Sequence, residues 1–565
     1  MMESSQPSLD YIDYVLFILV LLISFLIGLY YGMLSKVKQD TPEEYFLGNR
    51  NMGVFPVSIS LLVTFISGAS IIGLTVDVYA HGTHQWQYVF TCFIMLIATW
   101  YIFLPIFYEL QLPSTFAYLK LRFGRQTQLL ASFMFFCVAT LSASICIYIP
   151  ALVLNQTSGI SPAITMIILG LVCIFYTAIG GFRAVIWVDL FQSSLIVACC
   201  IAIIVIGLKL VGGVNEVWEA SKRGERLILF NFNPDPTIRL TTWIIIFGHS
   251  FQMIQFGFSQ MTIQRLLSIP SLTKARGVMF IFCIGFLCSI GFSLAIALIL
   301  YTYYEQCDPF KSGLISNIDQ LVTHFVTEIH EHFPGLPGIF IAGIVAGSLS
   351  TISSFLNSIT LCLFEDFILP FLPEMSHKKT CNIIKLLAFI LGSIQIALAF
   401  VIGKIGTIFV IVQTVLGLTG GALIGLFTMG MLLPKANQIG GIAGAISSLI
   451  GVGIIIFGSL SKKAQASLPM RTDGCLHNIT NFVNRALPTE INDTEDDVPW
   501  IFRISFMYYS TIGCVLVYLI GYPVSLLTGG INVKDQRLLA PFIRKKASNK
   551  LPQNVEELRP ISDQI

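Results

Sequence analysis

Residues 63–75 read Val-Thr-Phe-Ile-Ser-Gly-Ala-Ser-Ile-Ile-Gly-Leu-Thr and place hydroxyl groups and glycines inside an apolar stretch. That stretch, 54–80, exceeds the roughly 20 apolar residues that a helix needs to cross a bilayer. Glycine lets such a helix unwind, and the carbonyl groups that unwinding frees are tolerated only where they face protein or a cavity. Broken helices of this kind supply oxygen ligands for Na⁺ in secondary transporters. A face of small residues that packs against another helix is the alternative.

The composition of the whole chain is that of an integral membrane protein. Of its 565 residues 55% are apolar and 11% are charged, and the mean hydropathy is +0.79. A soluble protein carries about 25% charged residues, so the composition argues against a soluble enzyme and a disordered scaffold. The net charge of +2 provides no basic field for nucleic acid. The 13 cysteines show no metal-binding spacing, and with no catalytic motif we expect neither an enzyme nor a cofactor.

Apolar runs of membrane-spanning length recur from one end of the chain to the other. They predict an all-α polytopic protein with about thirteen transmembrane helices. The expected spans are 11–34, 54–80, 86–108, 128–154, 162–180, 185–211, 241–264, 278–303, 337–364, 384–403, 408–433, 439–459 and 501–527.

The second and seventh spans both contain glycines and polar residues, and they lie five spans apart. This interval is expected if spans 2–6 and 7–11 form two five-helix halves of opposite topology. We therefore divide the chain into an N-terminal part with the first helix and first inner loop (1–53), the first half (54–211), an outer loop (212–240), the second half (241–433), two last helices with the outer loop 460–500 (434–527) and a cytoplasmic tail (528–565).

Basic residues in the loops favour an N-terminus outside the cell and a C-terminus inside. The first 35 residues contain no Lys or Arg, whereas the tail contains seven. Asn478 and Asn492 carry glycosylation sequons on the predicted outer face. Cys307 and Cys475 also fall in predicted outer loops, where a disulfide between them is compatible with the sequence but is not decided by it.

A second polar stripe lies on the ninth expected span. Gly347, Ser350 and Thr351 are spaced i, i+3 and i+4, so they share one face of a helix. Two adjacent hydroxyls, together with carbonyls from a facing broken helix, are neutral oxygens of the kind that a hard monovalent cation binds. Close packing held by interhelical hydrogen bonds is the alternative, but the number of hydroxyls favours the ion site.

Asp189 lies at the junction of the fifth and sixth spans, after Gly180-Gly-Phe-Arg. An acidic residue within a span is by default a functional candidate, and Asp189 is placed to attract a cation toward the inner side. A structural salt bridge to Arg183, six residues earlier, is the alternative.

The seventh span is unusually polar because it carries His249, Gln252 and Gln255. This polarity indicates that the span lines a path through the membrane. Gln413 in the eleventh span invites a similar interpretation. His249 is interpreted as a hydrogen-bonded structural residue in preference to a proton relay.

Several motifs together resemble one known family. They are Glu44-Tyr-Phe-Leu-Gly, the stretch Tyr176-Thr-Ala-Ile-Gly-Gly-Phe-Arg-Ala-Val-Ile-Trp-Val-Asp189, Gln264-Arg-Leu, Ser350-Thr-Ile-Ser-Ser and Leu363-Phe-Glu-Asp366. With them the chain resembles the solute:sodium symporter family over nearly its whole length. The resemblance implies the LeuT-type fold of inverted five-helix repeats, with one extra N-terminal and two extra C-terminal helices. Within the family, the chain is most similar to the branch of monocarboxylate, multivitamin and iodide symporters.

The resemblance also implies roles for individual residues. It implies an inner ion exit near Asp189 and a substrate-facing position for Ser70 and Gln413. The polarity of their spans adds Ser67, Gln252 and Gln255 as substrate candidates. The Na⁺ site that the resemblance implies consists of the backbone carbonyls of Val63, Ile66 and Gly347 and the hydroxyls of Ser350 and Thr351.

We therefore expect a multi-pass symporter of the plasma membrane that imports a small organic or inorganic anion, such as a monocarboxylate, a vitamin carboxylate or iodide, by alternating access. Its partners are then Na⁺, the anionic solute and the lipid bilayer. Two alternatives stay open: a Na⁺-coupled transporter of a neutral solute such as a sugar, polyol or choline, and a channel or receptor with the same fold. The C-terminal Asp563-Gln-Ile565 resembles a ligand of PDZ domains.

Overall fold

A computed structural model describes residues 9–35, 39–330, 332–402, 408–459, 467–475, 499–530 and 533–544. Within these residues the secondary structure is helical, without strands. The main elements are α1 (Tyr11–Leu29), α2 (Pro42–Leu47), α3 (Val54–Phe65), α4 (Gly68–His81), α5 (Tyr88–Ala98), α6 (Leu104–Leu110), α7 (Thr115–Arg122), α8 (Arg125–Ser158), α9 (Pro162–Val211), α10 (Val214–Arg223), the π-helical turn η5 (Ile244–His249), α11 (Ser250–Phe258), α12 (Gln260–Leu267), α13 (Leu272–Tyr303), α14 (Leu321–Glu328), α15 (Leu336–Cys362), α16 (His377–Ile402), α17 (Ile408–Leu432), α18 (Gln438–Ser459), α19 (Trp500–Arg503), α20 (Tyr509–Leu516) and α21 (Tyr522–Leu527).

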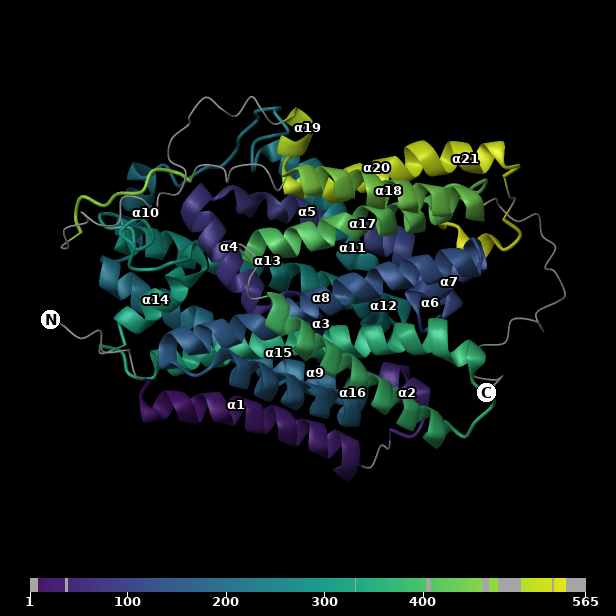
Figure 1. Ribbon diagram of the computed structural model, residues 1–565, viewed down its shortest axis with the longest axis horizontal. Coiled ribbons are helices and arrows are strands. Elements are labelled where there is room, and N and C mark those ends of the chain that lie inside the picture. The colour runs from purple at the N-terminus through teal and green to yellow at the C-terminus, as the bar shows by residue number, and fades with distance from the viewer. Residues whose placement is uncertain are drawn as a thin grey trace.

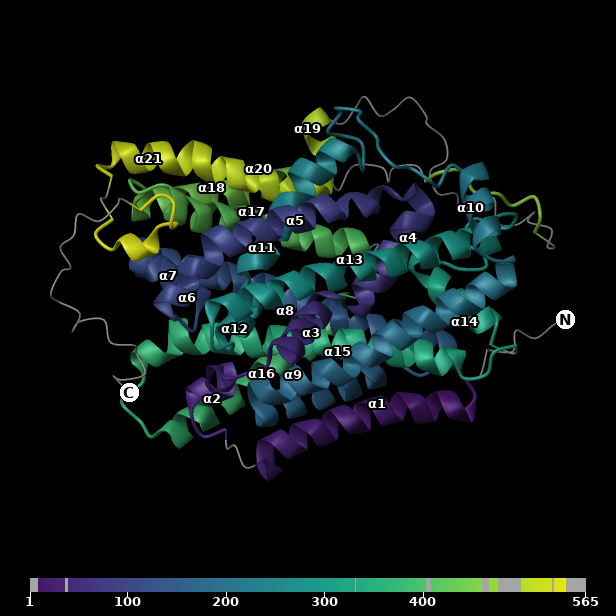
Figure 2. The same ribbon diagram turned by 180° about the vertical axis from the view of Figure 1, so that it is seen from behind.

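The long helices lie side by side (Figure 1), with α1 at one edge of the array and α20 and α21 at the opposite edge. The short helices α10 and α14 gather at one end, and α2 and α7 gather at the other, as the view from behind also shows (Figure 2). According to the orientation predicted from the sequence, the end with α10 and α14 faces outside.

Among the described residues, ten helices are long and apolar enough to cross a membrane, and the bent pair of α3 and α4 raises this number to eleven. Helix α9, counted once, contains 50 residues, which is about 75 Å of helix and more than twice the thickness of hydrocarbon. Gly181 (φ 59°, ψ −160°) interrupts it between the fifth and sixth expected spans. The all-α polytopic fold class is confirmed, whereas the count of thirteen spans and the division into segments stay predictions.

The second expected span is broken as its sequence predicts. Ile66 (φ −99°, ψ 79°) and Ser67 (φ −82°, ψ 164°) leave the helical conformation, and the two halves of the span differ in direction by 54°. The Ser67 hydroxyl accepts a hydrogen bond from the Ser70 N–H (3.2 Å), and the Ser70 hydroxyl accepts one from the Ser67 N–H (2.7 Å). This reciprocal capping fixes the place where α4 begins.

Helix α15 passes directly beside the break. A Cβ atom added to Gly347 would lie 3.0 Å from the backbone nitrogen of Gly68, and one added to Gly68 would lie 2.9 Å from the carbonyl oxygen of Ile344. Glycine on both sides lets the two backbones approach this closely. The broken span and the hydroxyl-bearing span are therefore neighbours.

The predicted outer end is tied together by a disulfide. Cys307, after α13, is bonded to Cys475, a pairing that the sequence left open. Nearby, the buried Arg226 donates hydrogen bonds to the carbonyl oxygens of Tyr79 (3.0 Å) and Pro469 (2.8 Å). Three features predicted from the sequence lie outside the described residues: the sequons at Asn478 and Asn492 and the C-terminal Asp563-Gln-Ile565.

Candidate functional site

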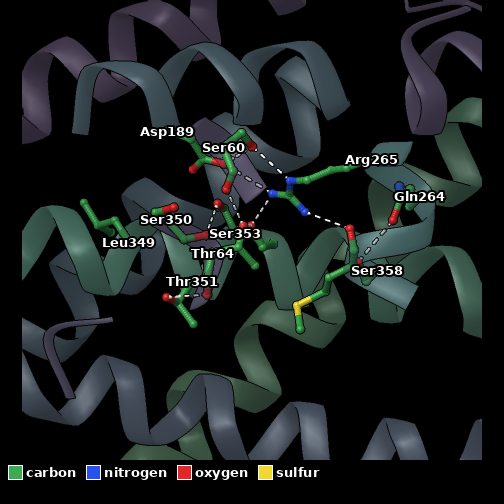
Figure 3. Close-up of polar contacts among 12 residues, drawn as sticks. Ser60, Thr64, Asp189, Gln264, Arg265, Leu349, Ser350, Thr351, Ser353 and Ser358 are labelled. Atoms are coloured by element: carbon green, nitrogen blue, oxygen red, sulfur yellow. Dashed lines mark hydrogen bonds and ion pairs between the residues drawn. The ribbon is translucent and has the colours of Figure 1, made fainter. Parts of the chain in front are cut away.

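The candidate cation site lies where the end of α3 meets α15 (Figure 3). Because α3 ends at Phe65, the carbonyl groups of its last turn lack partners further along the helix. The Thr351 hydroxyl lies 3.0 Å from the carbonyl oxygen of Thr64 and 3.0 Å from that of Gly347. The Ser350 hydroxyl is buried and makes no close hydrogen bond within the described residues, and the Asp189 carboxylate is the charged group that interacts with it. Burying a hydroxyl without a hydrogen-bond partner costs free energy unless a ligand or a water molecule binds it.

The remaining predicted sodium ligands lie in the same place. Ile66 and Val63 pack in one cluster with Ala346, the residue before Gly347. A Cβ atom added to Gly347 would lie 3.2 Å from the carbonyl oxygen of Ile66. The structure thus brings together the five residues predicted to bind Na⁺, although their two spans lie nearly 300 positions apart in the sequence. The oxygen atoms that these five residues offer to a cation are neutral.

A buried ion pair lies next to this site. The Arg265 guanidinium of α12 lies 3.2 Å from Asp189 of α9, and both side chains are almost fully buried. The Ser60 hydroxyl of α3 donates to Asp189 (2.5 Å) and accepts from Arg265 (2.9 Å). Arg265 also donates to the Ser354 hydroxyl of α15 (2.6 Å). A single arginine therefore joins four separate helices.

The salt bridge between Asp189 and Arg183 that the sequence left as an alternative is absent, so this alternative was wrong. Arg183 instead pairs with Glu44 of α2 and donates to the carbonyl oxygen of Gly48 (3.1 Å). The physical reason is the interruption at Gly181: it turns Arg183 toward α2, while Asp189 lies further along the second half of α9.

The ion-pair network is continuous with the candidate cation site. The Ser354 hydroxyl, which accepts from Arg265, lies 2.8 Å from the Thr64 hydroxyl. The Thr64 carbonyl in turn accepts from Thr351. Asp189 Oδ1 makes no close hydrogen bond in the described part of the chain, and the Ser350 hydroxyl of the cation site interacts with this carboxylate. Three successive hydrogen bonds therefore connect Arg265 to the Thr351 hydroxyl of the candidate cation site.

A cavity of about 210 Å³ adjoins the same residues. Thr64, Ile66 and Thr351 line it together with Ser67 and Ser70 at the start of α4. It extends to α8, α11, α13 and α17, where Gln252 and Gln255 of α11 also line it. No Asp, Glu, Lys or Arg belongs to the lining within the described residues.

Four of the five substrate candidates from the sequence thus line one cavity. The fifth candidate, Gln413, belongs to α17, but the placement of its side chain is not described. His249 is hydrogen-bonded, as predicted, with its Nδ1 atom 3.0 Å from the Thr91 hydroxyl, and it also lines the cavity.

The family assignment follows from comparison with known proteins. The sodium:solute symporter family matches the chain over residues 45–448. The chain belongs to this family. Among its relatives, sodium-coupled monocarboxylate transporter 1 of Homo sapiens is 34% identical over 531 residues, which are 90% of this chain and 86% of the relative. The sodium-dependent multivitamin transporter of Oryctolagus cuniculus is 33% identical over 546 residues, 94% of this chain and 85% of the relative.

Solved structures confirm the fold of this family member. A Na⁺-coupled sialic acid symporter in a substrate-bound, outward-open state superposes with a TM-score of 0.74, covering 92% of this chain and 98% of the other at 21% identity. The LeuT-type fold expected from the sequence is therefore confirmed. The chain is a multi-pass membrane transporter of a sodium-coupled family and not an enzyme.

Proposed function

We propose that this family member is a Na⁺-coupled symporter that carries a small anion, of the monocarboxylate, vitamin carboxylate or iodide class, into the cell by alternating access. The plasma membrane is its place of action, with the N-terminus outside and the C-terminus inside. One observation carries the proposal: Thr64, Ile66 and Thr351 belong both to the candidate cation site and to the wall of an uncharged cavity.

Because the cation site and the cavity share these residues, a bound cation and a bound anion would attract each other across them. An anion in a cavity without Lys or Arg among the described residues has no fixed positive charge to replace its hydration. The N-terminus of α4, at Gly68, supplies partial positive charge. A Na⁺ ion held by Val63, Ile66, Gly347, Ser350 and Thr351 would supply a full one. Each ligand then raises the affinity for the other, which is what cotransport requires.

The energy available is sufficient for concentrative uptake. A tenfold gradient is worth about 1.4 kcal/mol per Na⁺. One Na⁺ with one monovalent anion moves no net charge, whereas a second Na⁺ would move one net charge inward and add about 2.3 kcal/mol per 100 mV. In our proposal the network of Arg265, Asp189, Ser60 and Ser354 closes the predicted inner side, and Na⁺ leaves past Asp189 when that network opens.

Uptake in cells that express the protein tests the proposal. Labelled lactate, butyrate, pantothenate, biotin and iodide are offered with Na⁺ and with Na⁺ replaced by N-methylglucamine. Saturable uptake of at least one anion that disappears without Na⁺ is expected. Uptake that is indifferent to Na⁺, unitary current steps of a channel, or saturable Na⁺-dependent uptake confined to a sugar, polyol or choline would overturn it.

A further inference from the structure

His249 occupies a defined position on the cavity wall. It is the last residue of η5, and its ring stacks on Tyr88 at the start of α5, with centroids 3.8 Å apart and planes inclined by 16°. Both residues line the cavity and are at least nine-tenths buried. The stacking holds the imidazole plane, so the directions of its two nitrogen atoms are set by the fold.

The hydrogen bonds around Thr91 bear on which nitrogen of His249 carries the proton. The Thr91 hydroxyl lies 3.0 Å from the carbonyl oxygen of Tyr88 and 3.0 Å from Nδ1 of His249. Both atoms can accept a hydrogen bond, and the hydroxyl has one proton to donate. When that proton is donated to Tyr88, Thr91 accepts from His249 and Nδ1 carries the hydrogen. In a neutral ring of this tautomer Nε2 is a bare acceptor, and burial without an acidic partner among the described cavity residues keeps the ring neutral.

Nε2 makes no hydrogen bond within the described residues, and it is not among their fully buried, unpaired side-chain atoms. Because His249 lines the cavity, we take Nε2 to be the ring nitrogen that is accessible from it. Ser289 of the cavity wall also presents lone pairs, because its hydroxyl donates to the carbonyl oxygen of Phe286 (2.7 Å). This part of the wall therefore offers acceptors to a bound solute.

We propose that His249 is a specificity-determining residue, whose Nε2 accepts a hydrogen bond from a hydroxyl or N–H group on the carbon chain of the transported anion. The inference builds on the proposed symport of an anion and narrows its substrate to anions that carry such a donor. A polar site built to pair with a substrate group discriminates strongly against the analogue that lacks it, because its own polar atom is then left unpaired.

Matched pairs of probes test this inference. Lactate and propionate differ by one hydroxyl group, as do 3-hydroxybutyrate and butyrate, and the two pairs place the hydroxyl at different distances from the carboxylate. We expect the wild-type protein to have a KM about tenfold or more lower for the hydroxylated member of at least one pair. In His249→Phe, which keeps a ring against Tyr88 but removes the acceptor, the two KM values should become nearly equal.

Uptake of the unhydroxylated probes shows that the variant is folded, and two further variants separate recognition from structure. His249→Gln restores an acceptor and should recover part of the discrimination. Thr91→Val frees the ring to place its proton on Nε2, so the ratio of KM values should fall while the imidazole remains. His324→Phe, on α14 and outside the cavity, should leave the ratio unchanged.

Two results would overturn the inference, and they differ. A wild-type ratio near one for both pairs, or a ratio that His249→Phe leaves unchanged, contradicts the role of His249 while Na⁺-dependent uptake itself persists. Absence of Na⁺-dependent uptake of all four probes and of the other anions contradicts the proposed function, and the inference falls with it.

Discussion

The Thr351 hydroxyl lies 3.0 Å from the carbonyl oxygen of Thr64, across the contact between α15 and the last turn of α3. The same hydroxyl lies 3.0 Å from the carbonyl oxygen of Gly347, one turn earlier on its own helix. The hydroxyl has one proton, so it donates to one of these two carbonyl oxygens at a time, and its lone pairs remain for a cation. A cation at this point would meet a preformed set of oxygens instead of having to assemble one.

Ser350→Ala and Thr351→Ala are expected to raise the Na⁺ concentration for half-maximal uptake. Each removes one oxygen that faces the break, and a hydrogen-bond or ligand interaction with a charged group contributes about 1.5–3 kcal/mol, which is tenfold or more in affinity. Ser350→Ala should cost little stability, because the hydroxyl makes no close hydrogen bond among the described residues. The measurement is uptake of a fixed tracer over a series of Na⁺ concentrations.

Thr360→Ala is the matched control on the same helix. Its hydroxyl donates to the carbonyl oxygen of Leu356 (2.6 Å), two turns beyond the cation site, so the Na⁺ dependence should stay at the wild-type value. An unchanged Na⁺ dependence in both Ser350→Ala and Thr351→Ala would remove these residues from the cation site.

The break at Ile66 and Ser67 was predictable because local chemistry produces it: serine caps a helix, and glycine permits the close approach of another backbone. The side of α15 that bears Ser350 and Thr351 was predictable from helical spacing. The partner of Asp189 was not predictable. Helical periodicity shows on which face of its helix a residue lies, but not which neighbouring helix packs against that face. Arg265 ends a span in the sequence, where a basic residue is typical of an inner boundary. No signal within the chain indicated that it turns inward.

Asp189→Ala is expected to destabilise the protein strongly, because it leaves the Arg265 charge buried and uncompensated. Breaking such a pair from one side costs about 3–5 kcal/mol. The double variant Asp189→Ala/Arg265→Ala should be less destabilised than the sum of the two single variants. Thermal unfolding of the purified protein in detergent, carried out as a double-mutant cycle, measures the difference.

A surface ion pair provides the comparison for this cycle. Arg223 and Glu216 lie 2.8 Å apart with side chains about half exposed, so Glu216→Ala should cost less than about 1 kcal/mol. Additive effects of the Asp189 and Arg265 substitutions would show that the two side chains are not paired in the folded protein.

Gly68→Ala is expected to impair uptake more than tenfold and to raise the Na⁺ concentration for half-maximal uptake. Its Cβ atom would lie 2.9 Å from both the Ile344 carbonyl oxygen and the Ser348 hydroxyl, so α4 must move away from α15 and widen the cation site. Gly291→Ala, on α13, is the control: its Cβ atom meets nothing within 4 Å, and alanine is favoured over glycine in a helix by about 1 kcal/mol. Equal uptake by the two variants, measured against surface protein, would contradict the close contact.

Cys307→Ser and Cys475→Ser are expected to lower the Tm of the purified protein to the same degree, and the double variant should match either single one. The bond closes a loop with a sequence separation of 168 residues, and loss of a native disulfide typically costs about 2–5 kcal/mol. Around it, Asp308 donates from its backbone to Arg471 (2.9 Å) and Gly474 to Gln306 (3.0 Å), so the segment 467–475 should loosen with the bond. Cys288→Ser, at an exposed free cysteine, should leave the Tm unchanged. A Tm that is insensitive both to these substitutions and to a reductant would show that the outer segment is held by its hydrogen bonds alone.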